Sequence, residues 1–245
     1  MDNNTFFGFN NPASFYVTKF RNVKTPSRAN STDAGCDCFV PVVDAQFLED
    51  LYSMNYKNNT SLIINLHCSL PNGVVVKKTM SFDEITEYGK IYEDRDSIYD
   101  IMMCDMMETI YENGYNVEEL NETFSFYWDF TLPAHSRVLI PGGIKVTLFP
   151  KNSCLNVCNK SGVATKKGLV YTCHIIDSYY TGEVGYGVAN VSNEDVVIES
   201  DKKLLQVLHI PVYLSQPTEI NEDTYKMLTV DSDRGTGGFG STGLE

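Results

Sequence analysis

The clearest structural signal in this chain is the stretch Arg137-Val138-Leu139-Ile140-Pro141-Gly142-Gly143-Ile144-Lys145-Val146-Thr147-Leu148. Two runs rich in apolar and β-branched residues flank a Pro-Gly-Gly turn signal, a pattern that predicts two β-strands joined by a tight turn. Within Ile144–Leu148, apolar and polar residues alternate, as they do in a strand with one buried face. The centre of the sequence therefore indicates a β protein.

Similar runs continue on both sides of this stretch, with turn residues between them. The further predicted strands are Ser14–Phe20, Gly182–Val191, Val196–Ile198 and Leu204–Leu208, with strands resuming from Phe126 onward. Short strands with turn signals roughly every eight to twelve residues are typical of a sandwich or barrel. We expect an all-β fold of the jelly-roll kind.

Residues 44–125 have a different composition. They hold 16 Asp and Glu residues against 5 Lys and Arg, a net charge of −11 out of −13 for all 245 residues. Asp44–Met54 suits a short helix, and Pro71-Asn72-Gly73 suits a hairpin turn. Ser81-x-x-Glu84 forms a capping-box pattern, and apolar residues from Ile98 to Ile110 recur at helical spacing. We predict a small acidic α/β module inserted into the β chain.

Charge and cysteine content limit the function classes. A nucleic-acid-binding protein carries a basic surface, which a net charge of −13 argues against. No apolar run approaches the roughly 20 residues of a membrane helix. The first residues lack a secretory signal, and seven cysteines at irregular spacing suit reduced thiols. We expect an intracellular, cytoplasmic protein, located in the host cytoplasm if its source is viral.

The last residues, 231–245, contain five glycines and no hydrophobic periodicity. Consecutive glycine amides can turn towards one centre and bind an anion, and Arg234 can hold a phosphate through two parallel hydrogen bonds. Phe239 offers a flat face to a base. The plain alternative is a solvated Gly-rich linker, but a linker does not require Arg and Phe at this spacing. We expect a mobile tail that takes part in a site.

Two further segments carry groups suited to phosphate chemistry. Asn159-Lys160-Ser161-Gly162 combines a cation, a hydroxyl and a glycine in a predicted turn, although such turns are also common on surfaces. In His174–Glu183, Asp177 ends an apolar strand and could deprotonate a water, with Tyr180 three residues later to close over a sugar. A simple β-turn aspartate is the alternative explanation for Asp177.

The order of these segments resembles the five motifs of the trimeric dUTPase family. The matching segments are Ala34-Gly35-x-Asp37, Lys160-Ser161-Gly162, Ile176-Asp177-x-x-Tyr180-x-Gly182-Glu183, Lys203-Leu204-Leu205-Gln206 and Arg234-Gly235-Thr236-Gly237-Gly238-Phe239-Gly240-Ser241-Thr242-Gly243. The resemblance covers roughly residues 15–43 and 126–245. It divides the chain into a β core (1–43 and 126–230), the insertion 44–125 and an active-site tail (231–245).

The resemblance implies a homotrimer whose active sites are each assembled from three chains, and hydrolysis of dUTP to dUMP and pyrophosphate with Mg²⁺. It implies that Asp177 activates the attacking water and that Asp37 holds waters of the triphosphate-bound Mg²⁺. The implied substrate-binding residues are Lys160, Ser161, Gly162, Ile175, Ile176, Tyr180, Gln206, Arg234, Phe239, Gly240 and Ser241. Tyr180 would exclude a 2′-hydroxyl, backbone around Ile175 would read uracil, and Phe239 would cover the base.

Two departures and two alternatives accompany this prediction. Lys160 stands where the family usually has arginine, and His174 where it commonly has glycine. A dCTP deaminase shares the fold but has phenylalanine at the position of Tyr180. An interaction protein, using the module 44–125 to bind a partner, is the alternative from another class.

Overall fold

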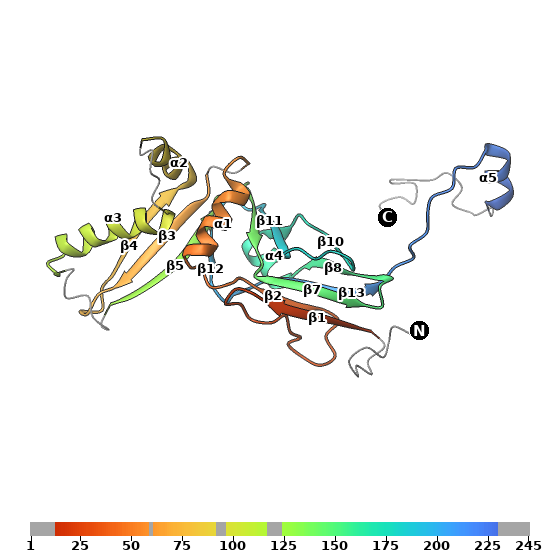
Figure 1. Ribbon diagram of the computed structural model, residues 1–245, viewed down its shortest axis with the longest axis horizontal. Helices are drawn as coiled ribbons and strands as arrows, with labels where there is room; N and C mark the ends of the chain where they lie inside the picture. The colour runs from red at the N-terminus through yellow and green to blue at the C-terminus, as the bar shows by residue number, and fades with distance from the viewer. Residues whose placement is uncertain (1–12, 59–60, 92–96, 117–123, 230–245) are drawn as a thin grey trace, which may run out of the picture. The chain divides into compact units, whose positions relative to one another are not determined.

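The computed structural model describes residues 13–58, 61–91, 97–116 and 124–229. It divides into two units, residues 1–212 and residues 213–245. The first unit contains all the strands of the described residues (Figure 1). The described part of the second unit contains the helix α5 (Glu222–Leu228). Asn221 caps its N-terminus, and the Asn221 side chain accepts a hydrogen bond from the Thr224 amide.

Two sheets of the first unit build the β body around the predicted strand–turn–strand. One has the strand order β10-β8-β13-β2 and the other β6-β11-β9, while β1 pairs with β7. The bounds are β1 Ser14–Lys19, β2 Cys36–Phe39, β6 Arg137–Pro141, β7 Ile144–Phe149, β8 Ser153–Asn159, β9 Leu169–Tyr171, β10 Ile175–Asp177, β11 Gly185–Asn190 and β13 Lys203–Pro211. Every pair in these sheets is antiparallel, as expected for a β protein of short strands.

The turn between β6 and β7 is fixed by close packing at Gly143. Its φ of 71° lies in the left-handed region, and a Cβ there would come within 2.9 Å of the Arg21 Cβ atom. Both the backbone angle and the lack of space favour glycine. Arg21 therefore packs directly against this turn.

A third sheet joins the acidic segment to the rest of the unit. Its strand order is β12-β5-β3-β4, and α2 and α3 pack against β4 (Figure 1). The bounds are α1 Ala45–Asn55, β3 Ile63–Ser69, β4 Val75–Ser81, α2 Phe82–Ile91, α3 Ile98–Glu112, β5 Ser125–Leu132 and β12 Val196–Glu199. Since β3 pairs along its whole length with β5, and β5 with β12, the sheet includes strands from both sides of residue 125.

The helices and the hairpin predicted for this segment are present. The Asp44 side chain caps α1 by accepting from the Phe47 amide, and the Ser81–Glu84 capping box forms with reciprocal hydrogen bonds. Along α1, Phe47, Leu48 and Leu51 are fully buried. These side chains belong to the same hydrophobic cluster as Phe130 and Ile140, so segment and β body share a core.

Asn55 fastens α1 to the edge of β6. Its Nδ2 donates to the Leu139 carbonyl at 2.8 Å, and its Oδ1 accepts from the Leu139 amide at 2.8 Å. Nδ2 also donates to the Leu51 carbonyl, and the side chain is almost fully buried. The Asn55 side chain thus supplies hydrogen-bond partners to the Leu139 backbone at the edge of β6, as a neighbouring strand would.

We expect Asn55→Ala to lower the free energy of unfolding by about 2–4 kcal/mol, because it leaves the part-buried Leu139 amide and carbonyl without their partner on α1. Urea denaturation measures this loss. Ser53→Ala, an exposed position on the same helix, is the control and should change stability by less than about 0.5 kcal/mol. Equal stability of the two variants would contradict this role of Asn55.

Among the described helices, none is long and apolar enough to cross a membrane.

Candidate functional site

A buried carboxylate between two lysines forms the first part of the candidate site. Asp37 on β2 is 4% exposed, and its Oδ1 accepts from Lys160 Nζ at 2.8 Å while its Oδ2 lies 2.7 Å from Lys203 Nζ. Gln206, directly opposite Asp37 in the β13–β2 register, donates from Nε2 to the Asn159 carbonyl at 2.7 Å. Three predicted residues, Asp37, Lys160 and Gln206, therefore meet in one place.

Lys203 belongs to the fourth motif, but the sequence does not identify it as a site residue. Strand pairing supplies the missing information, since Lys203 begins β13 opposite Phe39 and so lies beside Asp37. A lysine at the start of a strand carries no local sign of this contact. Two ammonium groups around one carboxylate leave the cluster with a net positive charge that suits a phosphate chain.

The two lysines determine the ionisation of Asp37. Burial tends to raise its pKa, but the hydrogen bonds and charges of Lys160 and Lys203 outweigh burial and lower the pKa below the ordinary value of 3.8. A carboxyl whose pKa is lower in the folded state stabilises the fold above its unfolded pKa. It loses this contribution as the pH falls towards the folded pKa.

We therefore expect Asp37→Asn to be less stable than the wild type near pH 7, and the difference in Tm to shrink as the pH falls below about 4. Thermal melts from about pH 2.5 to 7 measure this difference. Asp33→Asn, at a carboxylate that has no lysine or arginine partner among the described residues, is the control. A Tm difference that stays constant through the acid range would contradict the role of the Asp37 charge.

Ser161 and Gly162 lie beside this cluster but in a different structure from the predicted turn. They begin the helix α4 (Ser161–Lys167), with Lys160 at its N-cap position and Gly168 (φ 67°) ending it. Both residues are exposed, and the position of a Gly162 Cβ faces open space. The first amides of a helix have no intrahelical acceptor, so the helix start still presents free hydrogen-bond donors here.

The second part of the site is the strand β10 and the turn after it. Ile175 and Asp177 are exposed on β10 and pair with Asn156 and Cys154 of β8, and Ile176 between them is half-buried. The Val157 amide donates to the His174 carbonyl at 2.7 Å and ties the start of β10 to β8. The His174 ring lies edge-on to the Tyr171 ring with centroids 5.1 Å apart.

Tyr180 is held in a folded-back position by its own turn. Its hydroxyl donates to the Glu183 carbonyl at 2.7 Å, and its amide donates to the Asp177 carbonyl at 3.1 Å. A Cβ on Gly182 would come within 2.4 Å of the Tyr180 hydroxyl oxygen, so only glycine leaves room for the ring. With 47% of its surface exposed, Tyr180 still offers the ring to a ligand.

An ion-pair network that the sequence did not reveal holds Glu183, at the end of this turn. Arg21 donates from Nε to Glu183 Oε1 at 3.1 Å and from Nη2 to Glu183 Oε2 at 3.3 Å, and it also contacts Asp50 of α1. Burial tends to lower the pKa of Arg21, but Glu183 and Asp50 outweigh burial and raise it. Glu183 is 162 positions and Asp50 29 positions from Arg21 in the sequence, so no local pattern could predict the network.

The two parts of the site are far apart within one chain. Asp177 and Asp37 lie on the outer strands of the sheet β10-β8-β13-β2, three strand spacings or about 14 Å apart. Their partners on β8, Cys154 and (through Gln206) Cys158, are four residues or about 13 Å apart along the strand. One chain therefore does not bring Asp177 and Asp37 to the same small ligand.

The remaining predicted residues, Arg234, Phe239, Gly240 and Ser241, and the tail 231–245 lie outside the described residues.

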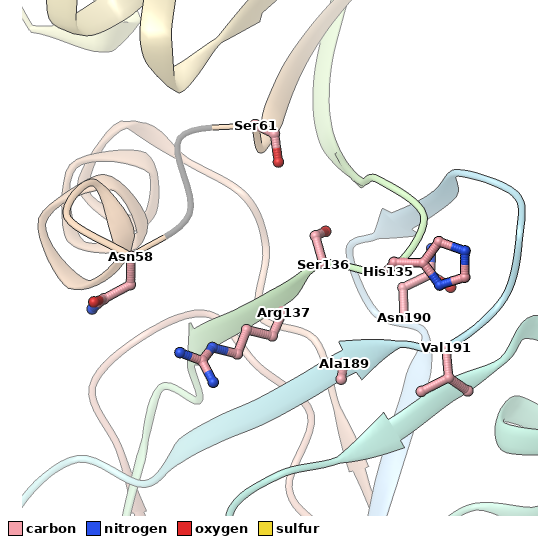
Figure 2. Close-up of a pocket in the computed structure, with 8 residues that line it drawn as sticks. All are labelled: Asn58, Ser61, His135, Ser136, Arg137, Ala189, Asn190 and Val191. Carbon is pink, nitrogen blue, oxygen red and sulfur yellow. The ribbon is translucent and has the colours of Figure 1, made fainter.

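A cavity of about 640 Å³ lies away from all these residues. It is lined by residues from β6, β11 and the ends of α1 and β3 (Figure 2): Asn58, Ser61, His135, Ser136, Arg137, Ala189, Asn190 and Val191. A neighbouring cavity of about 370 Å³ shares Asn58 and Arg137 and reaches Thr172 and Cys173. The predicted base Asp177 lies on an exposed strand instead, and neither cavity is lined by Asp177 or Asp37.

Metal-binding groups are sparse in the described part of the chain. No cluster of three or more His, Cys, Asp or Glu side chains there could hold a metal ion. A protein cage for Mg²⁺ is therefore not formed by these residues, whereas a phosphate-borne Mg²⁺ needs only one or two carboxylates and water. Asp37 fits that lesser requirement.

Comparisons with known proteins identify relatives of the β body. The family model for dUTPase matches residues 125–243. The deoxyuridine 5'-triphosphate nucleotidohydrolase of Clostridium novyi is 34% identical over 118 residues, which are 47% of this chain and 78% of the relative. The corresponding protein of Candida glabrata is 31% identical over 115 residues, 47% of this chain and 76% of the relative.

A solved structure resembles nearly the whole chain in fold. The dUTPase of Staphylococcus bacteriophage 80alpha with dUPNHPP has a TM-score of 0.50 at 16% identity, covering 94% of this chain and 99% of that chain. Because the alignment covers 94% of the chain, it includes most of residues 44–125. The predicted β fold of the jelly-roll kind is confirmed.

Proposed function

Since the chain belongs to the dUTPase family, we propose that it hydrolyses dUTP to dUMP and pyrophosphate at a site shared between the chains of a homotrimer. The observation that carries the shared site is the separation of Asp177 from Asp37, about 20 Å by strand geometry. A base and the water that it activates lie within hydrogen-bond distance, and that water attacks the same triphosphate that carries the metal. The two carboxylates must therefore come from different chains.

Asp177 acts as the general base in this proposal. It is exposed at the end of β10, where the backbone on either side of Ile175 offers donors and acceptors to a uracil edge. The carboxylate orients a water in line with the leaving pyrophosphate, takes its proton and leaves little other covalent chemistry to the protein. Because side chains alternate along a strand, Ile175 and Asp177 lie on one face of β10 and Ile176 lies on the other.

The cluster around Asp37 receives the phosphate chain. Lys160 and Lys203 supply positive charge, Ser161 and Gly162 supply donors at the start of α4, and Gln206 holds the nearby backbone. Mg²⁺ on the triphosphate would be held through water by Asp37 and would neutralise charge that develops on the leaving group. From the family pattern, Arg234 binds the terminal phosphate, while Phe239, Gly240 and Ser241 cover the nucleotide.

Hydrolysis of a nucleotide panel tests this function. We expect pyrophosphate release from dUTP to exceed that from dTTP, dCTP and UTP by at least about a hundredfold in kcat/KM with Mg²⁺. The products also separate a deaminase, which would convert dCTP to dUTP. Equal hydrolysis of dTTP and dUTP would contradict a uracil pocket.

Tyr180 is the residue that we expect to reject a ribonucleotide. Tyr180→Ala opens space beside the sugar, so discrimination between dUTP and UTP should fall by about 10- to 100-fold. Tyr179→Ala, at the exposed neighbouring ring, is the matched control. An unchanged preference for dUTP in Tyr180→Ala would show that the sugar is read elsewhere.

The division of the chain into a β core (1–43 and 126–230), the acidic module (44–125) and the tail (231–245) remains part of this proposal. For the module we propose a protein partner with a basic surface. Its charge of −11 and exposed side chains support this, Tyr111 being 70% and Val75 50% exposed. Loss of a captured partner in Tyr111→Ala/Val75→Lys, with dUTP turnover unchanged, is the expected result. Retention of the partner by this variant would contradict it.

A further inference from the structure

The acidic module touches the base of the Tyr180 turn through a short series of charged groups. Asp50 of α1 contacts Arg21, and Arg21 holds both carboxylate oxygens of Glu183, at 3.1 and 3.3 Å. The Glu183 carbonyl in turn accepts the Tyr180 hydroxyl at 2.7 Å. One path of direct contacts therefore runs from the inserted helix to the ring that faces the sugar.

Asp50 and Glu183, the two carboxylates of this series, are each held by a second contact. Gln46 donates to the other oxygen of Asp50 at 3.2 Å. Asn55, on the same helix as Asp50, anchors α1 to Leu139 of β6. The Gly143 amide donates to Glu183 Oε1 at 2.7 Å, which ties the carboxylate to the β6–β7 turn.

Burial makes the balance of charge in the network important. The Arg21 side chain is 9% exposed, that of Glu183 16% and that of Asp50 29%. Both Glu183 oxygens are occupied by Arg21 and one of them also by Gly143, while Asp50 binds Arg21 from the side of the module. Without Asp50, Arg21 keeps one anion and gains freedom to move, and Glu183 moves with it.

We propose that Asp50 is a positioning residue for nucleotide binding, which acts through Arg21 and Glu183 to set the Tyr180 turn. This inference rests on the proposed function and extends it, because it makes the acidic module part of the sugar-binding apparatus. Asp50 touches no substrate, and Asp177 lies on the other side of the turn, on β10. Substrate binding and sugar discrimination, more than the chemical step, should depend on Asp50.

Asp50→Asn tests the proposal kinetically. The expected result is a rise in KM for dUTP of about five- to tenfold with kcat within about twofold, and a fall of about tenfold in the preference for dUTP over UTP. Asp50→Glu keeps the charge and should recover most of the preference. Asp83→Asn is the matched control, since it removes one negative charge from an exposed position of the same module.

Hydrogen exchange supplies a readout that does not depend on turnover. The Gly143 amide donates to Glu183, and the Tyr180 amide closes the turn by donating to the Asp177 carbonyl. Both amides should exchange about tenfold faster in Asp50→Asn than in the wild type or Asp83→Asn. Should the wild type fail to hydrolyse dUTP, the proposed function fails while exchange still decides the coupling. The inference is overturned if Asp50→Asn and Asp83→Asn have equal amide exchange rates and an equal preference for dUTP over UTP. A lowered Tm of Asp50→Asn alone does not support it.

Discussion

Asp177→Asn is expected to lower kcat for dUTP by about a thousandfold or more while leaving KM within a few-fold. The amide has the size of the carboxylate but cannot accept the proton of the attacking water, and positioned bases contribute about 10²–10⁴-fold. Because Asp177 is exposed on β10 and has no ion-pair partner among the described residues, the loss cannot come from a broken structural contact. Stopped-flow measurement of pyrophosphate release gives the rate.

Two controls accompany this variant. Its Tm should match the wild type within about 2 °C, and it should bind a non-hydrolysable dUTP analogue with near wild-type affinity. Asp195→Asn removes a carboxylate from a loop outside the site, where Asp195 accepts a hydrogen bond from the Ala134 amide, and should keep full turnover. Full turnover by Asp177→Asn would assign the base to another residue.

Asp177→Asn and Asp37→Asn, which we expect to lose the base and the metal-holding carboxylate respectively and so to be nearly inactive, should restore each other's activity when their chains are mixed. If Asp177 and Asp37 in one site come from different chains, a mixed trimer of Asp177→Asn and Asp37→Asn contains some sites with both carboxylates intact. Random exchange at equal amounts gives about a quarter of the sites this composition. Activity should therefore rise from near zero to about 25% of the wild type after joint unfolding and refolding.

The matched control mixes Asp177→Asn with a chain that carries both substitutions. No site in that mixture can hold both intact carboxylates, so activity should stay near zero. Mass spectrometry of the refolded trimers verifies that chains have exchanged. Mixed trimers without recovered activity would place both carboxylates in the site of a single chain.

Local sequence patterns predicted the helices and strands in which residue propensity and hydrophobic spacing match the structure that forms. The alternation in Ile144–Leu148, the capping box of α2 and the apolar spacing of α3 each appear where the sequence places them. β8 was not predicted, because Asn156, Asn159 and Ser153 have low strand propensity. It is a strand because β10 and β13 pair with both of its edges.

The predicted turn at Lys160-Ser161-Gly162 is a helix for a similar reason. Gly162 and the β-branched Val163 and Thr165 are poor helix formers, but Gly168 ends the segment with a left-handed cap, and α4 packs against β9. In the site, the motif pattern led to Asp37 and Lys160, which the structure brings together. Lys203 and the Arg21–Glu183–Asp50 network depend on strand register and distant pairing, which no single stretch of sequence encodes.

The pairing of β3 with β5, and of β5 with β12, has a consequence for how this protein can be engineered or recombined. Excising residues 44–125 would strip one long edge of β5 of its backbone partners and uncover Phe130, whose ring packs against Phe47 with centroids 6.0 Å apart. A transplant of the acidic segment into another scaffold would have to bring Ser125–Leu132 and Val196–Glu199 with it. The exchangeable unit is the four-stranded sheet, and its borders differ from those of the contiguous acidic stretch.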